Sequence, residues 1–140
     1  MTLKSMRFPH CVPIDYMHLF HLNLAEHVYK ILASQVQNTN VWEDAGRDLV
    51  RNRKQIPSNW RQKPLRNINN HYNGFKASEW RAWLNNYALP SLDGRITATQ
   101  LDILSRLVYA SCLVGEHKLD MVQIDILREM LSTFLILFEK

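Results

Sequence analysis

The sequence predicts a mainly helical fold, a bundle of about five helices with a short N-terminal strand stub. First, 140 residues are enough for one domain with a sizeable core. Second, apolar residues make up 46% of the chain and recur at spacings of three and four, as on the buried face of a helix. Third, four glycines and five prolines are too few for an all-β sandwich, which turns about every ten residues.

The first helix is predicted from Tyr16 to Gln37, directly after an extended stub at residues 11–14. Pro13 disfavours helical angles in the residue before it. Asp15 is a good N-cap, because its carboxylate can accept from the free amides of the first turn. The buried stripe is expected to consist of apolar residues three and four apart: Met17, Phe20, Leu24, Val28, Ile31 and Leu32.

Two further helices are predicted at residues 42–54 and 77–88, ended by Pro57 and Pro90. The segment between them, residues 56–75, is rich in asparagine and lacks periodicity, which indicates a long connection. In the second of these helices, the helical spacing of three aromatic residues favours a core position over a base-stacking platform: Trp80, Trp83 and Tyr87.

Two capping boxes predict the last two helices. Thr97 with Gln100 opens a helix that Gly115 closes, and Asp120 with Gln123 opens one that continues to the C-terminus. A chain that begins on a strand stub and ends inside an amphipathic helix is expected to have been cut from a larger protein at both ends.

Positive charge is concentrated in residues 47–66, which contain seven basic residues and one acidic residue, Asp48. Such a window with an exposed aromatic residue is typical of a nucleic-acid-binding surface. Its predicted members are Arg47, Arg51, Arg53, Lys54, Trp60, Arg61, Lys63 and Arg66. The alternative is that the basic residues near its start, three and four apart, form only the solvated face of a helix.

Several classes of protein are excluded. The glycines stand singly, which excludes a glycine-rich phosphate loop, and a Gly-x-Ser-x-Gly nucleophile elbow is missing. The distant cysteines Cys11 and Cys112 cannot form a disulfide framework or a four-cysteine zinc site, which indicates a reducing compartment. Residues 1–11 contain no secretory apolar stretch, and the longest apolar run, residues 130–138, is too short to cross a bilayer.

Polar groups able to bind a metal gather near the N-terminus: His10, Cys11, Asp15, His18, His21 and His27. His18 and His21 are three apart and could face one zinc ion, although we expect His21 to lie on the solvated side. A second alternative is that Asp15 is a hard oxygen ligand for magnesium, although one carboxylate alone binds magnesium poorly. A third is that Asp15 is only the helix cap.

The segment Ile14-Asp15-Tyr16-Met17-His18-Leu19 resembles the Asp-x-x-His motif of CACTA-type (En/Spm-like) DDE transposases, in which a short strand delivers the aspartate and a helix follows. Further similar pieces keep the order found in that family: Ile56-Pro57-Ser58, Arg66-Asn67-Ile68, Gly74-Phe75-Lys76-Ala77-Ser78-Glu79-Trp80 and Leu89-Pro90. The Lys-Ala-Ser-Glu-Trp element is the most persuasive of them because it is unusual. The resemblance covers roughly Phe8 to the C-terminus.

The resemblance implies an RNase H-like catalytic core, whose two aspartates and one glutamate hold two magnesium ions for cutting and joining DNA. Asp15 would be the second of these carboxylates and a magnesium ligand, and His18 its catalytic motif partner. The helices from Glu43 onwards would be an insertion placed before the final glutamate. Neither Glu79 nor Glu129 is assigned as that glutamate, so the carboxylates needed for magnesium are expected to be incomplete in this chain.

Two functional hypotheses follow. In the first, residues 1–18 are the remnant of a catalytic core and residues 19–140 an insertion-like domain with a basic loop at 47–75. The chain is then a nuclear transposase fragment that contacts DNA without a complete active site. In the second, it is an independent helical module that docks on a protein partner, or on itself, through the C-terminal apolar helix.

Overall fold

The computed structural model describes residues 15–36, 40–55 and 65–138, and every regular element within these ranges is helical. The elements in chain order are η1 (Met17–Leu24), α1 (Ala25–Gln35), α2 (Asn40–Arg51), η2 (Asn52–Gln55), α3 (Ile68–His71), η3 (Tyr72–Gly74), α4 (Ala77–Ala82), η4 (Trp83–Tyr87), α5 (Ala88–Leu92), α6 (Ala98–Val114) and α7 (Met121–Phe138). The predicted helical fold is confirmed for these residues. The expected strand stub at residues 11–14 lies outside them.

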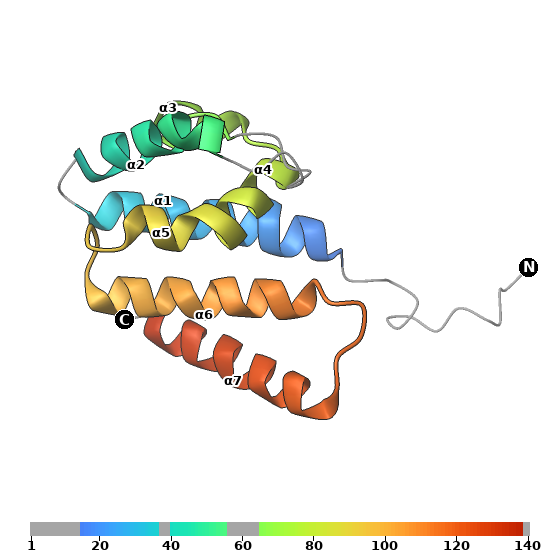
Figure 1. Cartoon of the computed structure of the whole chain (residues 1–140). Coiled ribbons are helices and arrows are strands. Elements are labelled where there is room, and N and C mark those ends of the chain that lie inside the picture. The colour runs from blue at the N-terminus through green and yellow to red at the C-terminus, as the bar shows by residue number, and fades with distance from the viewer. Residues whose placement is uncertain (1–14, 37–39, 56–64, 139–140) are drawn as a thin grey trace, which may run out of the picture.

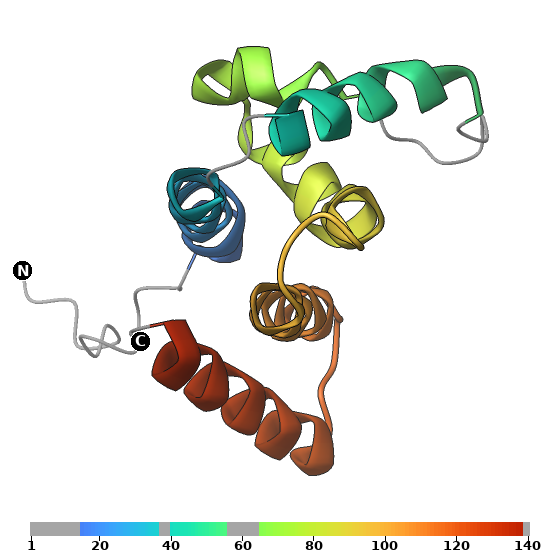
Figure 2. The same ribbon diagram turned by 90° about the vertical axis from the view of Figure 1, so that its left-hand side faces the viewer.

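The helices form tiers, as Figures 1 and 2 show. The α2 and α3 helices lie at one end, and η1–α1 and α4–η4–α5 run together through the middle. The α6 helix packs below this middle tier, and α7 lies at the outer edge against α6. None of the described helices is long and apolar enough to span a bilayer.

The predicted buried stripe of the long first helix is confirmed in part: Phe20, Val28 and Leu32 are buried, whereas the face of its first turns is different. Its first part, η1, is a π-helix, in which bonds from residue i to i+5 bring residues five apart onto one face. Tyr16 and His21 therefore lie together, with ring centroids 4.7 Å apart, while the apolar Met17 is left exposed. The prediction that His21 is solvated is wrong, because its side chain is fully buried.

Two predicted boundaries between α2 and α6 are also corrected. The predicted connection at residues 56–75 contains α3 and η3, and its residues 56–64 lie outside the described residues. Pro90 does not stop the helix, which continues to Leu92. Because a new α-helical segment begins at Ala88, Pro90 falls in its first turn, where a backbone N–H has no partner within the segment.

Both predicted capping boxes are confirmed. The Thr97 hydroxyl accepts from the backbone N–H of Gln100, and the Gln100 side chain accepts from that of Thr97. Asp120 and Gln123 make the same reciprocal pair before α7. The α6 helix ends at Gly115, as predicted.

The core is centred on the ring of Tyr29, which lies against four other aromatic rings. The ring centroids are 4.7 Å from Trp42, 5.1 Å from Tyr72, 5.7 Å from Trp80 and 5.6 Å from Trp83. Edge-on and tilted aromatic contacts of this kind add to the free energy gained from burial. The prediction that Trp80 and Trp83 belong to the core is therefore confirmed, and Tyr87 packs against it half-buried.

A close approach between α2 and α3 depends on Gly46. A Cβ atom added at this buried position would overlap the side-chain amide of Asn67, the residue before α3. The glycine is thus a contact point between α2 and the start of α3.

We expect Gly46→Ala to lower the free energy of unfolding. Overpacking costs about 1 to 3 kcal/mol, which exceeds the gain of about 1 kcal/mol in helix propensity. Chemical denaturation of the two proteins measures the difference. In an Asn67→Ala background the obstruction is gone, and the same substitution should become neutral or stabilising. A stabilised Gly46→Ala single variant would contradict the close contact.

Candidate functional site

Asp15 and His18 form an exposed pair at the start of the first helix. One oxygen of the Asp15 carboxylate lies 2.5 Å from Nδ1 of His18, and the other accepts from the His18 backbone N–H at 3.2 Å. The side-chain hydrogen bond from His18, followed by the backbone one, lowers the pKa of Asp15. The capping role of Asp15 is thus seen directly, and the aspartate and histidine of the motif are in contact.

The described residues do not by themselves fit a magnesium or zinc ion. Both oxygens of Asp15 are engaged by His18, and no group of three His, Cys, Asp or Glu side chains converges anywhere in the described ranges. His18 faces Asp15, His21 is buried, and His27 lies 6.3 Å from the ring of Phe138. The other predicted zinc ligands, His10 and Cys11, lie outside the described residues.

His21 belongs to a buried polar network that sequence reasoning missed. Its Nε2 lies 3.2 Å from the Ser111 hydroxyl, which donates to Oδ1 of Asn85 at 2.9 Å. Because the single hydroxyl proton of Ser111 is used in this way, Nε2 of His21 is the donor, and Nδ1 has no partner among the described residues. The Tyr16 hydroxyl also donates to the Ser111 carbonyl, at 2.8 Å.

This network fixes the N-terminal end of the first helix to α6 and η4. Burial, reinforced by the positive charge of Arg81, lowers the pKa of His21 to about 4. The ring is therefore neutral in the folded protein near pH 7. The sequence signal for this role is the five-residue spacing between Tyr16 and His21. This spacing places the two side chains on one face only in a π-helix, so it could not be interpreted before the helix type was known.

Two arginines of the predicted DNA-binding window have structural partners. The Arg53 guanidinium donates to the Leu65 carbonyl at 2.9 Å, which joins η2 to the segment before α3. Arg66 donates from Nε and Nη2 to the two carboxylate oxygens of Glu79, each at 2.8 Å. Arg66 also donates to the Gly74 carbonyl at 2.6 Å.

Arg66 and Glu79 join two segments of the chain, residues 66–68 and 74–80. The Arg66 guanidinium lies 5.3 Å from the centroid of the Phe75 ring, and that ring lies 5.2 Å from Trp80. Glu79 also accepts from the Lys76 backbone N–H at 3.0 Å, capping α4. The hydrogen bond from Arg66 is the main cause that lowers the pKa of Glu79. Glu79 is thus a structural residue here.

Arg47 and Arg51 differ from these two because their side chains are exposed on α2. Arg47 pairs with Asp44 on the same helix, an exposed ion pair that competing phosphates can replace. Asp48, the acidic residue of the window, pairs with Arg95 at 2.5 Å. Lys54 lies in η2, but its side chain is not among the described ones, and Trp60, Arg61 and Lys63 lie outside the described residues.

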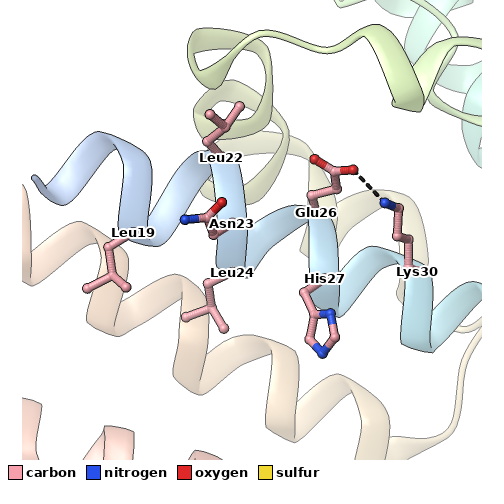
Figure 3. A pocket seen from close by; sticks show the side chains of 7 residues that line it. All are labelled: Leu19, Leu22, Asn23, Leu24, Glu26, His27 and Lys30. Atoms are coloured by element: carbon pink, nitrogen blue, oxygen red, sulfur yellow. Dashed lines mark ion pairs between the residues drawn. The ribbon is translucent and has the colours of Figure 1, made fainter.

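A shallow hollow of ≈ 490 Å³ lies beside η1 and α1, and it does not include Asp15 or His18. In Figure 3, Leu19, Leu24 and His27 point to one side of the helix and Leu22 to the other. Glu26 and Lys30 pair across its rim at 2.6 Å. The hollow is lined by one continuous helix, and its polar groups are too few and too exposed to form a reaction site.

Comparison with protein-family models, curated proteins and solved structures found no match for this chain.

We expect the stability of the fold to decrease as the pH falls from about 6.5 towards 4. The pKa of His21 is lower in the folded protein than in the unfolded chain, so the unfolded state binds more protons between these pH values. Stability is therefore lost as the pH falls. The loss should reach about 1 to 2 kcal/mol by pH 5. Urea denaturation at about pH 7 and pH 5 measures it.

The His21→Gln variant should show a smaller decrease over the same pH range, whatever its stability near pH 7. The matched variant His71→Gln changes an exposed histidine of α3 and should show the same decrease as the wild type. Equal pH dependence in all three proteins would show that His21 is not the group responsible.

Proposed function

We propose that this chain is part of a CACTA-type (En/Spm-like) DDE transposase and contacts DNA through the exposed arginines of α2. In this proposal the helices from α2 onwards form an insertion next to an RNase H-like core. Asp15 supplies one carboxylate of the catalytic site, and His18 positions it. The remaining carboxylates would have to come from outside the described residues, so no catalytic step is derived for the chain alone.

The observation that carries the proposal is the cluster formed around Arg66. Two of the pieces of sequence that carry the resemblance meet there: Arg66 comes from one, and Gly74, Phe75 and Glu79 come from the other. A chance likeness of short motifs would not require its residues to contact one another. The unusual Lys-Ala-Ser-Glu-Trp element also has a physical purpose here, because Glu79 caps α4 while Trp80 enters the core.

The second support is that two arginines of the window have exposed side chains, although one of them, Arg47, is in an exposed ion pair with Asp44. Arg53 and Arg66 are bound to a carbonyl and a carboxylate, whereas Arg47 and Arg51 stand exposed one turn apart on α2. Two guanidinium groups at this spacing can follow a phosphate backbone. DNA contact is therefore expected to begin at the C-terminal half of α2.

We expect the double substitution Arg47→Glu/Arg51→Glu to weaken binding to random duplex DNA on the order of tenfold near physiological salt. The plot of log K against log salt should become shallower by about 1 to 2, because two phosphate contacts are lost. Fluorescence anisotropy with a labelled duplex measures both quantities. Circular dichroism should be unchanged, since neither side chain is buried.

Arg128→Glu is the matched control for the single variant Arg47→Glu, because each arginine is exposed and pairs with an aspartate three residues earlier, Asp125 and Asp44. It should leave DNA affinity almost unchanged. Equal loss in both variants would mean that net charge alone governs binding. A wild-type affinity that does not change with salt would remove DNA contact from the proposal and favour the independent protein-interaction module.

A further inference from the structure

A groove between α6 and α7 has no partner in the described structure. Its cavity of ≈ 710 Å³ is lined mainly by apolar side chains of the two helices, with Leu89 at one end. Figures 1 and 2 together show that α7 packs against α6 at an angle. Only Phe134 of α7 is fully buried, and Tyr109 of α6 is 47% exposed beside the groove.

The spacing of the wall residues fits a third helix. From α6, Ser105, Tyr109 and Cys112 face the groove at intervals of four and three. From α7, Ile126 and Met130 face it four residues apart, and the exposed Val122 continues the row one turn earlier. Two rows at these intervals form the ridges between which side chains of another helix pack.

The charges at the groove indicate what kind of helix it would accept. Asp102 and Arg106 neutralise each other through a 3.0 Å ion pair. Glu129, near the middle of α7, lines the groove and forms no ion pair with any other described residue. The groove therefore carries one uncompensated negative charge among apolar walls, and a positively charged side chain would complement it.

A second copy of α7 does not meet this requirement. Two α7 helices paired antiparallel about the middle of this row, Ile126, would place the Glu129 carboxylates beside Gln123 of the opposite copy, which supplies no positive charge to them. Arg128 cannot neutralise them, because it is 100° away around the helix and already pairs with Asp125 at 2.9 Å.

We propose that the groove between α6 and α7 binds an amphipathic helix of another protein, whose apolar residues at i, i+3 or i+4, and i+7 enter the groove and whose lysine or arginine pairs with Glu129. This interaction surface is separate from α2 and does not depend on DNA contact. If no helix binds the groove, the proposed DNA contact through α2 is unaffected. If α2 does not contact DNA, the proposed groove interaction is unaffected.

The test uses the whole chain and two synthetic helical peptides that differ at one position. Both carry leucines at the stated spacing; one has a lysine and the other a glutamate at the central position on the same face. Fluorescence anisotropy should show that the lysine peptide binds about two- to fivefold more tightly. Glu129→Lys should reverse this preference, whereas Glu43→Lys, at an exposed glutamate of α2, should not.

Tyr109→Glu should weaken both peptides at least about fivefold, because a charge would then enter the apolar wall. Circular dichroism verifies that this exposed substitution leaves the helices intact. Equal affinity of the wild type for the two peptides would overturn the proposal, as would binding that is unaffected by Tyr109→Glu. Sedimentation showing a dimer that the peptides cannot enter would assign the groove to a second copy and would also overturn it.

Discussion

The packing of four aromatic rings around Tyr29 is the constraint on which the rest of the structure depends. Tyr29 lies on α1, and its neighbours come from α2, η3, α4 and η4. Much of the upper part of the bundle is thus positioned by one side chain (Figure 1). The short elements α3, η3 and α4 could not hold their positions by helix propensity alone, because isolated helices of this length are unstable in water.

In the folded chain, two arginines of the basic window have structural roles. Beside the aromatic core, Arg53 and Arg66 donate hydrogen bonds to the carbonyls of Leu65 and Gly74 and to the carboxylate of Glu79. A charge count treats all arginines as equal, but a guanidinium that holds Glu79 from two nitrogens is largely committed to the fold. Among the described arginines of the window, those with exposed side chains are therefore Arg47 and Arg51 of α2.

The N-terminal corner combines an exposed pair with a buried one. Asp15 and His18 face outward, while three residues later His21 is held by Ser111 inside the bundle. The buried contact fixes the direction in which the first turn projects, and this in turn fixes where the Asp15 carboxylate lies. A structural residue thus positions a candidate functional one, and the two histidines cannot serve a common zinc ion.

Local signals in the sequence determined the helical class, the two capping boxes, the end of α6 and the burial of Trp80 and Trp83. Each depends on residues within a few positions of one another, so spacing is sufficient evidence. Only the tertiary structure decided the burial of His21, the pairing of Arg66 with Glu79 and the contact of Gly46 with Asn67. These depend on partners distant in the chain and, for His21, on a π-helical winding that turns the buried face away from the 3.6-residue period.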